Sequence, residues 1–205
     1  LWKLVEISSI SISSLNTKNV ISLMSENSAS FVISYLGIIN SGKIPHLIPP
    51  EISETNLLAQ ITSSDSSTII CSKNIYHKIL KYNSIKIPIF QFDKILKNID
   101  NSTIDSKSND MAYLIYTSGT TSIPKGVGIT HFMVDFTTNN IIKILKYTNS
   151  DIDVLPLPLH HSFGLGCLHT SLCVGSTLIL LKNTNDLQNI LDTIKKFNAT
   201  TLAAI

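Results

Sequence analysis

The residues best suited to bind phosphate lie together in the run YTSGTTSIPKGVGITH, at positions 116–131. Gly119 allows the backbone to turn its N–H groups toward an anion, and Lys125 adds a mobile positive charge. Five hydroxyl side chains surround this glycine, at Thr117, Ser118, Thr120, Thr121 and Ser122. Hydroxyls, turned N–H groups and a lysine in this order predict a loop that binds phosphate.

The sequence on either side of this loop indicates how it is positioned. Residues 111–116 (MAYLIY) are almost continuously apolar, which is typical of a strand buried on both faces. Pro124 fixes its own φ, and Gly126 and Gly128 allow close approach of the backbone. Thr130 is suited to cap a following helix, whose N-terminus would also favour negative charge. We therefore expect the loop between a buried strand and a helix.

Two other interpretations of the loop are weaker. A Ser/Thr-rich surface turn has a similar composition, so it stays open as an alternative. The nucleotide-triphosphatase pattern G-x-x-x-x-G-K-[ST] is not met, because Pro124 precedes Lys125 and Gly126 follows it.

A second group of chemically suited residues follows a predicted strand further along the chain. It comprises His160, His161, Ser162, Phe163 and Gly164. Open α/β sheets bind ligands just beyond the ends of their strands, so this position favours a binding site. The alternative is a pair of loop histidines that are hydrogen-bonded to backbone.

A metal site is a rival interpretation of the same region, because three histidines and two cysteines fall within residues 160–173. Closed zinc sites favour tight C-x-x-C or H-x-x-x-H pairs. Only His169 and Cys173 share a face of the predicted helix, and free cysteines in an apolar helix are usually core residues. We therefore predict no metal ligands.

Composition excludes several classes of protein. The chain has 205 residues, 43% of them hydrophobic and 15% charged, with a net charge of +2. Its sixteen basic residues are all scattered lysines, so nucleic-acid binding is not expected. The longest apolar stretch, 31–39, is too short to span a bilayer. Three cysteines cannot all pair internally, which favours a cytoplasmic protein.

Helical and strand patterns alternate along the chain, which predicts an α/β fold with a helix-covered, mostly parallel sheet. The polar run 98–110 reads as an exposed linker. We expect a first subdomain over 1–148, with the phosphate loop at 116–128, and a truncated second subdomain over 149–205. Strands are predicted at 20–24, 43–48, 68–71, 85–90, 111–116, 153–155, 177–181 and 200–205, and helices at 1–15, 26–40, 53–60, 74–81, 131–147, 163–173 and 187–197.

The 116–131 run resembles, nearly letter for letter, the phosphate loop of the adenylate-forming (AMP-binding) superfamily. This superfamily contains acyl-CoA synthetases, luciferases and peptide-synthetase adenylation domains. Residues 19–50 look like its early strand, helix and strand, and residues 154–180 look like its acid-pocket histidine and the helix that follows. Ser122 departs from the pattern, which usually has glycine there. The resemblance implies an incomplete, N-terminal part of the adenylate-forming fold.

The resemblance also implies a function. It implies an ATP- and Mg²⁺-dependent enzyme that activates a carboxylic acid as an acyl adenylate, then passes the acyl group to a thiol of coenzyme A or a carrier protein. His161, Phe163 and Gly164 would line the acid pocket. The ATP phosphates would be held by Thr117, Ser118, Gly119, Thr120, Thr121, Ser122, Lys125 and Gly126.

The family's later motifs, which supply adenine, ribose and catalytic-lysine contacts, have no match before Ile205. We therefore assign no catalytic residue within these 205 residues and expect the chain alone to be inactive. The alternative is a non-catalytic, adenylation-like module that binds a nucleotide, an acyl group or a partner.

Overall fold

A computed structural model describes residues 1–15, 17–96, 109–117, 124–182 and 186–204. The chain divides into two compact units, one of Leu1–Ser25 with Ala29–Thr130 and one of Glu26–Ser28 with His131–Ile205. This division falls earlier than the subdomain boundary predicted at residue 148. The reason is that the helix α6 (His131–Leu145) packs against α7 (Ser162–Val174) of the second unit.

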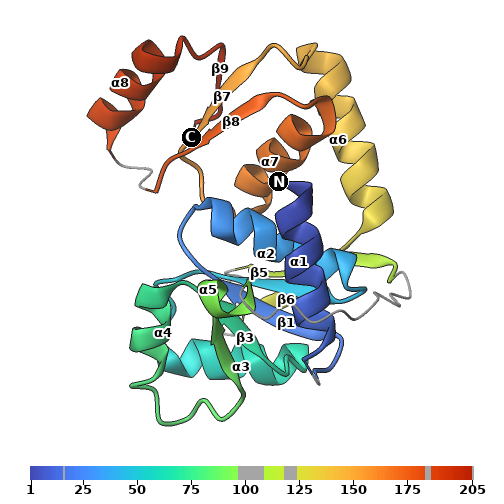
Figure 1. Ribbon diagram of the computed structural model, residues 1–205, viewed down its shortest axis with the longest axis vertical. Helices are drawn as coiled ribbons and strands as arrows, with labels where there is room; N and C mark the ends of the chain where they lie inside the picture. Colours follow the sequence, from blue (N-terminus) through green and yellow to red (C-terminus); the bar gives the residue numbers. More distant parts are fainter. Residues whose placement is uncertain (16, 97–108, 118–123, 183–185, 205) are drawn as a thin grey trace. The chain divides into compact units, whose positions relative to one another are not determined.

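The first unit is built on a six-stranded sheet with the order β4-β3-β1-β2-β5-β6 (Figure 1). Among the described strands, every neighbouring pair is parallel except β5 and β6. The predicted mostly parallel sheet is therefore confirmed. The strands are β1 (Val20–Met24), β2 (Ile44–Ile48), β3 (Ile69–Cys71), β4 (Ile89–Gln91), β5 (Met111–Thr117) and β6 (Lys125–Thr130).

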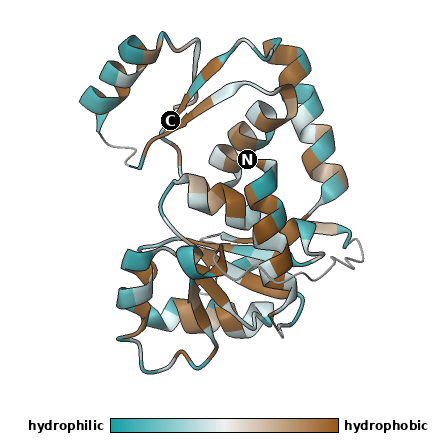
Figure 2. Cartoon of the chain, in the orientation of Figure 1, coloured by the Kyte–Doolittle hydropathy of each residue, from teal (hydrophilic) through white to brown (hydrophobic). Residues whose placement is uncertain are grey.

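Helices cover both faces of this sheet. In Figure 1, α1 (Trp2–Ser13) and α2 (Ala29–Asn40) lie on one face, and α3 (Glu54–Ser64) and α4 (Lys73–Ile79) lie on the other. Figure 2 shows that the strands and α2 are predominantly apolar. One core cluster joins the sheet to α3 and α4 through Met24, Ile48, Leu57, Ile61, Ile69, Cys71, Ile75 and Ile79. The alternating pattern thus produces two buried layers of side chains around a central sheet.

Local signals position the start of α3 and the end of α2 as predicted. Ser53 precedes α3, and its hydroxyl accepts a hydrogen bond from the Asn56 N–H at 3.3 Å. Gly42, after α2, has φ of 74°, a left-handed conformation that glycine adopts without strain. The helix α3 continues past Gln60 to Ser64, where Asp65 ends it with φ of 53°.

Replacing Ser53 with alanine should lower the free energy of unfolding by about 1 kcal/mol, because the first turn of α3 loses its capping acceptor. Urea unfolding of both proteins measures this change. Ser53→Gly is the control, since glycine at a helix N-cap lowers stability by only a few tenths of a kcal/mol. Equal losses in the two variants would contradict a capping role.

The second unit contains a three-stranded parallel sheet with the order β8-β7-β9. Its strands are β7 (Ile152–Leu155), β8 (Thr177–Leu180) and β9 (Thr201–Leu202), and its helices are α6, α7 and α8 (Leu187–Phe197). A small core forms where Val154, Leu181 and Ile190 meet. The strand predicted from Thr200 is thus present but only two residues long in the described part.

Some local predictions were wrong. Residues 125–130 form the strand β6, so the helix α6 does not follow the loop directly. The helix α2 begins at Ala29 instead of residue 26, and the short helix α5 (Phe92–Ile95) was not predicted. Most of the predicted linker lies outside the described residues. Within the residues that are described, no helix is both long enough and apolar enough to span a membrane.

Candidate functional site

The predicted phosphate loop joins two antiparallel strands. Thr117 is the last residue of β5 and pairs with Lys125, the first residue of β6. Because β5 runs parallel to β2, Thr117 lies at the carboxyl edge of the parallel strands, where open α/β sheets bind ligands. Both residues are exposed to solvent. The predicted residues Ser118, Gly119, Thr120, Thr121 and Ser122 lie outside the described residues.

The glycines of β6 allow side chains of β5 to lie across it. A Cβ atom on Gly126 would stand 3.1 Å from Cζ of Tyr116, and one on Gly128 would stand 2.9 Å from Cε of Met111. Larger residues at either position would push these side chains away. Gly126 therefore has a packing role beside Tyr116, in addition to the phosphate-binding role predicted for it.

A buried histidine lies against the end of β5. The rings of His46 on β2 and Tyr116 have centroids 5.0 Å apart. The His46 Nε2 is 3.3 Å from Oε1 of Gln60, and its Nδ1 is 3.1 Å from the Ser22 hydroxyl. Tyr116 in turn hydrogen-bonds through its hydroxyl to Ser63 of α3. These contacts join the strand that leads into the loop to β1, β2 and α3.

Burial lowers the pKa of His46 to about 4, and the hydrogen bond with Gln60 offsets only part of this effect. The ring is therefore neutral at pH 7. Its Nε2–H faces the Gln60 oxygen and donates to it, so its Nδ1 is an acceptor, with the Ser22 hydroxyl at 3.1 Å and the Ser64 hydroxyl at 3.3 Å. His46 was not among the predicted site residues, although a histidine within the apolar run KIPHLIPP was a visible signal.

The second predicted group follows β7, on a segment held by Asn27. The Asn27 amide donates to the Leu157 carbonyl at 2.8 Å and accepts from the Leu159 N–H at 2.9 Å. Leu157 and Leu159 are themselves buried. This clamp fixes the backbone immediately before His160 and His161.

The two histidines lie side by side at the start of α7. Their ring centroids are 4.5 Å apart, and His161 is the N-cap residue, immediately before the helix begins at Ser162. The His161 carbonyl accepts from the Leu165 N–H at 3.0 Å, and its ring is exposed. Burial, together with the neighbouring His161, lowers the pKa of His160 to about 4. An exposed ring at a helix N-terminus leaves His161 accessible to a ligand.

Gly164 is buried where the first turn of α7 meets the clamped segment. A Cβ atom there would lie 2.3 Å from the carbonyl oxygen of Pro158 and 2.9 Å from that of Leu157. Only glycine lets α7 approach this backbone so closely. The neighbouring Phe163 is 51% exposed and lines a cavity.

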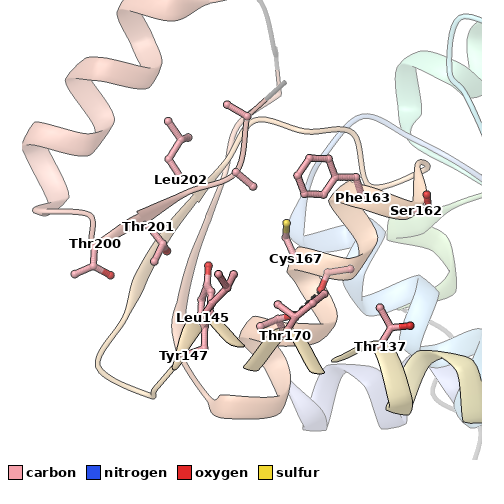
Figure 3. A pocket seen from close by; sticks show the side chains of 14 residues that line it. Thr137, Leu145, Tyr147, Ser162, Phe163, Cys167, Thr170, Thr200, Thr201 and Leu202 are labelled. Atoms are coloured by element: carbon pink, nitrogen blue, oxygen red, sulfur yellow. Dashed lines mark hydrogen bonds between the residues drawn. The ribbon is translucent and has the colours of Figure 1, made fainter. Parts of the chain in front are cut away.

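This cavity has a volume of about 850 Å³ and is formed by α6, α7 and the residues around β9 (Figure 3). None of the described residues that line it is charged. Of the three predicted acid-pocket residues, Phe163 lines the cavity. His161 and Gly164 are close to Phe163 in sequence, at the same end of α7, and are not among the lining residues. The wall is completed by Thr137, Ile141, Leu145, Tyr147, Ser162, Gly166, Cys167, Thr170, Thr200, Thr201, Leu202, Ala203 and Ala204.

The rival metal interpretation gains no support in the described part of the chain, where no group of three His, Cys, Asp or Glu residues could hold an ion. Burial raises the pKa of the Cys167 thiol to about 11 and lowers that of His169 to about 4.

Comparison with known proteins gives the family. The model of a family described as AMP-binding enzyme matches residues 12–205. The chain belongs to the AMP-binding enzyme family. The resemblance to adenylate-forming proteins inferred from the 116–131 run is thereby confirmed.

Two relatives match this chain over most of its length. Oxalate–CoA ligase of Arabidopsis thaliana is 28% identical over 91% of this chain and 40% of its own length. Tyrocidine synthase 3 of Brevibacillus parabrevis is 25% identical over 86% of this chain and 3% of its own length. The chain therefore spans less than half the length of these relatives.

Solved structures share the fold of this chain. O-succinylbenzoate coenzyme A synthetase of Bacillus subtilis in complex with AMP superposes with a TM-score of 0.88 at 24% identity, covering 99% of this chain and 54% of that one. Its complex with ATP and a magnesium ion gives a TM-score of 0.86 at 21% identity, covering 98% and 55%. The predicted fold class is confirmed, and the individual site residues stay predictions.

Proposed function

We propose that this protein takes part in the ATP-dependent activation of a carboxylic acid, with the phosphate loop binding the β- and γ-phosphates. The observation that carries this proposal is the pairing of Thr117 with Lys125, which places a residue with a hydroxyl opposite a residue with an ammonium group at the carboxyl edge of the sheet. Membership of the AMP-binding family supports the nucleotide as the ligand.

In the proposed reaction a carboxylate oxygen attacks the α-phosphorus of ATP, and the bond from that phosphorus to the bridging oxygen breaks. The products are an acyl adenylate and pyrophosphate. A carboxylate is a poor electrophile until it carries such a leaving group. Lys125, the Thr117 hydroxyl and the loop residues Ser118–Ser122 would hold the departing pyrophosphate, which is a positioning and electrostatic role.

The described residues at the two ends of the phosphate loop are chemically suited to bind the triphosphate of ATP. Lys125 is an exposed cation opposite a hydroxyl, which suits phosphate oxygens. Mg²⁺ usually binds through substrate phosphates and one or two carboxylates, so we propose that it accompanies ATP. When bound, it would neutralise part of the phosphate charge.

We further propose that the cavity of the second unit receives the acid. The first turn of α7 presents backbone N–H groups and the positive end of the helix dipole, which favour a carboxylate. In this proposal Phe163 is part of the pocket wall, and Gly164 sets the position of the first turn of α7. His161 lies immediately before that turn and would be next to the acid. The activated acyl group would then pass to the thiol of coenzyme A or of a carrier protein.

The test is exchange of labelled pyrophosphate into ATP by the full-length protein, with and without a panel of carboxylic acids. Exchange that depends on an added acid supports the proposal. Binding of ATP without any acid-dependent exchange would favour the alternative, a non-catalytic module that retains the nucleotide or acyl site.

Lys125→Ala should reduce ATP affinity or turnover in this assay by about 10- to 100-fold, because a charge-assisted contact with phosphate contributes roughly 1.5–3 kcal/mol. Steady-state kinetics with varied ATP measure the effect. Lys3→Ala, at an exposed lysine on α1, is the matched control and should leave both constants unchanged. An unaffected Lys125 variant would show that the lysine does not contact phosphate.

A further inference from the structure

A buried carboxylate lies behind one end of the cavity in the second unit. Asp153 of β7 is 5% exposed and accepts hydrogen bonds from the Tyr147 hydroxyl at 2.5 Å and the Ser171 hydroxyl at 2.5 Å. Ser176 donates to it at 3.4 Å, and the Thr201 hydroxyl also hydrogen-bonds to it. A carboxylate only accepts hydrogen bonds, so Tyr147 and Thr201 must direct their protons toward it and away from the cavity that they line.

Two further hydroxyls of the cavity wall also donate their protons to groups of the protein. Thr170 donates to the Gly166 carbonyl at 2.9 Å. Thr200 donates to the Asp151 carboxylate at 2.9 Å and accepts from the Ile152 N–H at 2.9 Å, which leaves it one lone pair. A hydroxyl group has one proton and two lone pairs, so it can still accept once that proton is used. Thr170 is only 1% exposed, so the hydrogen-bond acceptors that this end of the cavity offers to ligands come from Tyr147, Thr200 and Thr201.

The other end of the cavity differs in chemistry. Figure 3 shows Ser162 and Phe163 on the far side of the cavity from Thr200, Thr201 and Leu202. Ser162 and Phe163 belong to the first turn of α7, where a carboxylate is favoured. An acid bound this way would direct its remote end toward the acceptors.

We propose that the acid is a monocarboxylic acid with a hydrogen-bond donor, such as a hydroxyl group, at the end remote from its carboxylate. Asp153 sets this preference as a positioning residue, by orienting the Tyr147 and Thr201 hydroxyls. A second carboxylate at the remote end would meet hydrogen-bond acceptors that are themselves hydrogen-bonded to the Asp153 carboxylate, which disfavours it. This inference rests on the proposed function.

The test uses the full-length protein and acids that differ only at the remote end. The probes are octanoate and 3-phenylpropanoate, each carrying a terminal hydroxyl, methoxy or carboxylate group. Acid-dependent pyrophosphate exchange gives kcat/KM for each, and calorimetry gives Kd. The hydroxyl form should exceed the methoxy form by about tenfold on at least one scaffold, since the methoxy group accepts but cannot donate.

Tyr147→Phe should reduce this hydroxyl preference to within about twofold, and Asp153→Asn should raise the use of the dicarboxylates. Tyr82→Phe is the matched control: its hydroxyl donates to the Ile52 carbonyl in the first unit, so the preference should stay unchanged. The ratio between probes reports specificity even where a variant is less stable.

Efficient exchange by the wild-type protein with no preference between hydroxyl and methoxy forms would overturn this inference and leave the proposed function standing. Absence of exchange with every acid would overturn the proposed function, and the inference with it. If Asp153→Asn fails to fold, the wild-type panel and Tyr147→Phe still decide the question.

Discussion

Replacing Gly164 with alanine should lower the free energy of unfolding by about 3 kcal/mol, as expected when extra volume is forced into a close-packed site. The added methyl group would lie 2.3 Å from the Pro158 carbonyl oxygen, a backbone atom that the Asn27 clamp on both neighbouring residues holds in place. The start of α7 would have to move, and Phe163 would move with it. Urea unfolding measures the loss, and the KM for the acid should rise in the same variant.

Gly166→Ala is the matched control, two residues along the same helix. A Cβ atom at Gly166 has no neighbour within 4 Å. Alanine favours a helix by up to about 1 kcal/mol over glycine, so this variant should be neutral or more stable. Equal destabilisation at both positions would indicate a general sensitivity of α7, and a stable Gly164→Ala would show that the helix start is not held against residues 157–158.

Lowering the pH from 7 to 4 should destabilise the protein, and His46 should contribute on the order of 3 kcal/mol of the loss. Its pKa is about 4 in the folded protein, against 6.5 for an unperturbed histidine. Below pH 6.5 the unfolded chain therefore binds a proton at His46 that the folded protein excludes. The stabilisation is complete above pH 6.5 and is lost as the pH falls toward 4. His160 and His169, whose pKa values are also about 4, add to the loss.

Urea unfolding between pH 7 and pH 4 measures this dependence. His46→Gln should be less stable at pH 7, because it loses ring contacts with Tyr116, but its free energy of unfolding should change less with pH. His77→Gln, at an exposed histidine on α4, should keep the wild-type pH profile. A profile of His46→Gln that is as steep as the wild-type profile would mean that His46 takes no part in acid destabilisation.

Local patterns predicted much of the α/β alternation. The strand β1 and the helix α8 begin and end at the residues predicted for them, 20–24 and 187–197. Ser53 caps α3 and Gly42 adopts the left-handed conformation after α2, as expected. These features depend on apolar periodicity and on turn chemistry within a few residues, which a sequence displays directly.

The strand β6 illustrates what local patterns miss. Its sequence, KGVGIT, contains two glycines and reads as a loop. It forms a strand because β5 supplies the pairing partner, and because Tyr116 and Met111 occupy the space beside Gly126 and Gly128. That stabilisation comes from residues on another strand, so the intrinsic propensity of 125–130 could not indicate it.

The sequence by itself determined the family, the alternating fold and the identity of the phosphate-loop and acid-pocket candidates, because long motifs and periodic patterns are local properties. Only the tertiary structure showed that Thr117 pairs with Lys125 and that His46 is buried. It also showed that the hydroxyls of Tyr147, Ser171 and Thr201 hydrogen-bond to Asp153. The physical reason is that a buried polar group needs hydrogen-bonding partners, and the fold brings those partners together from distant parts of the chain.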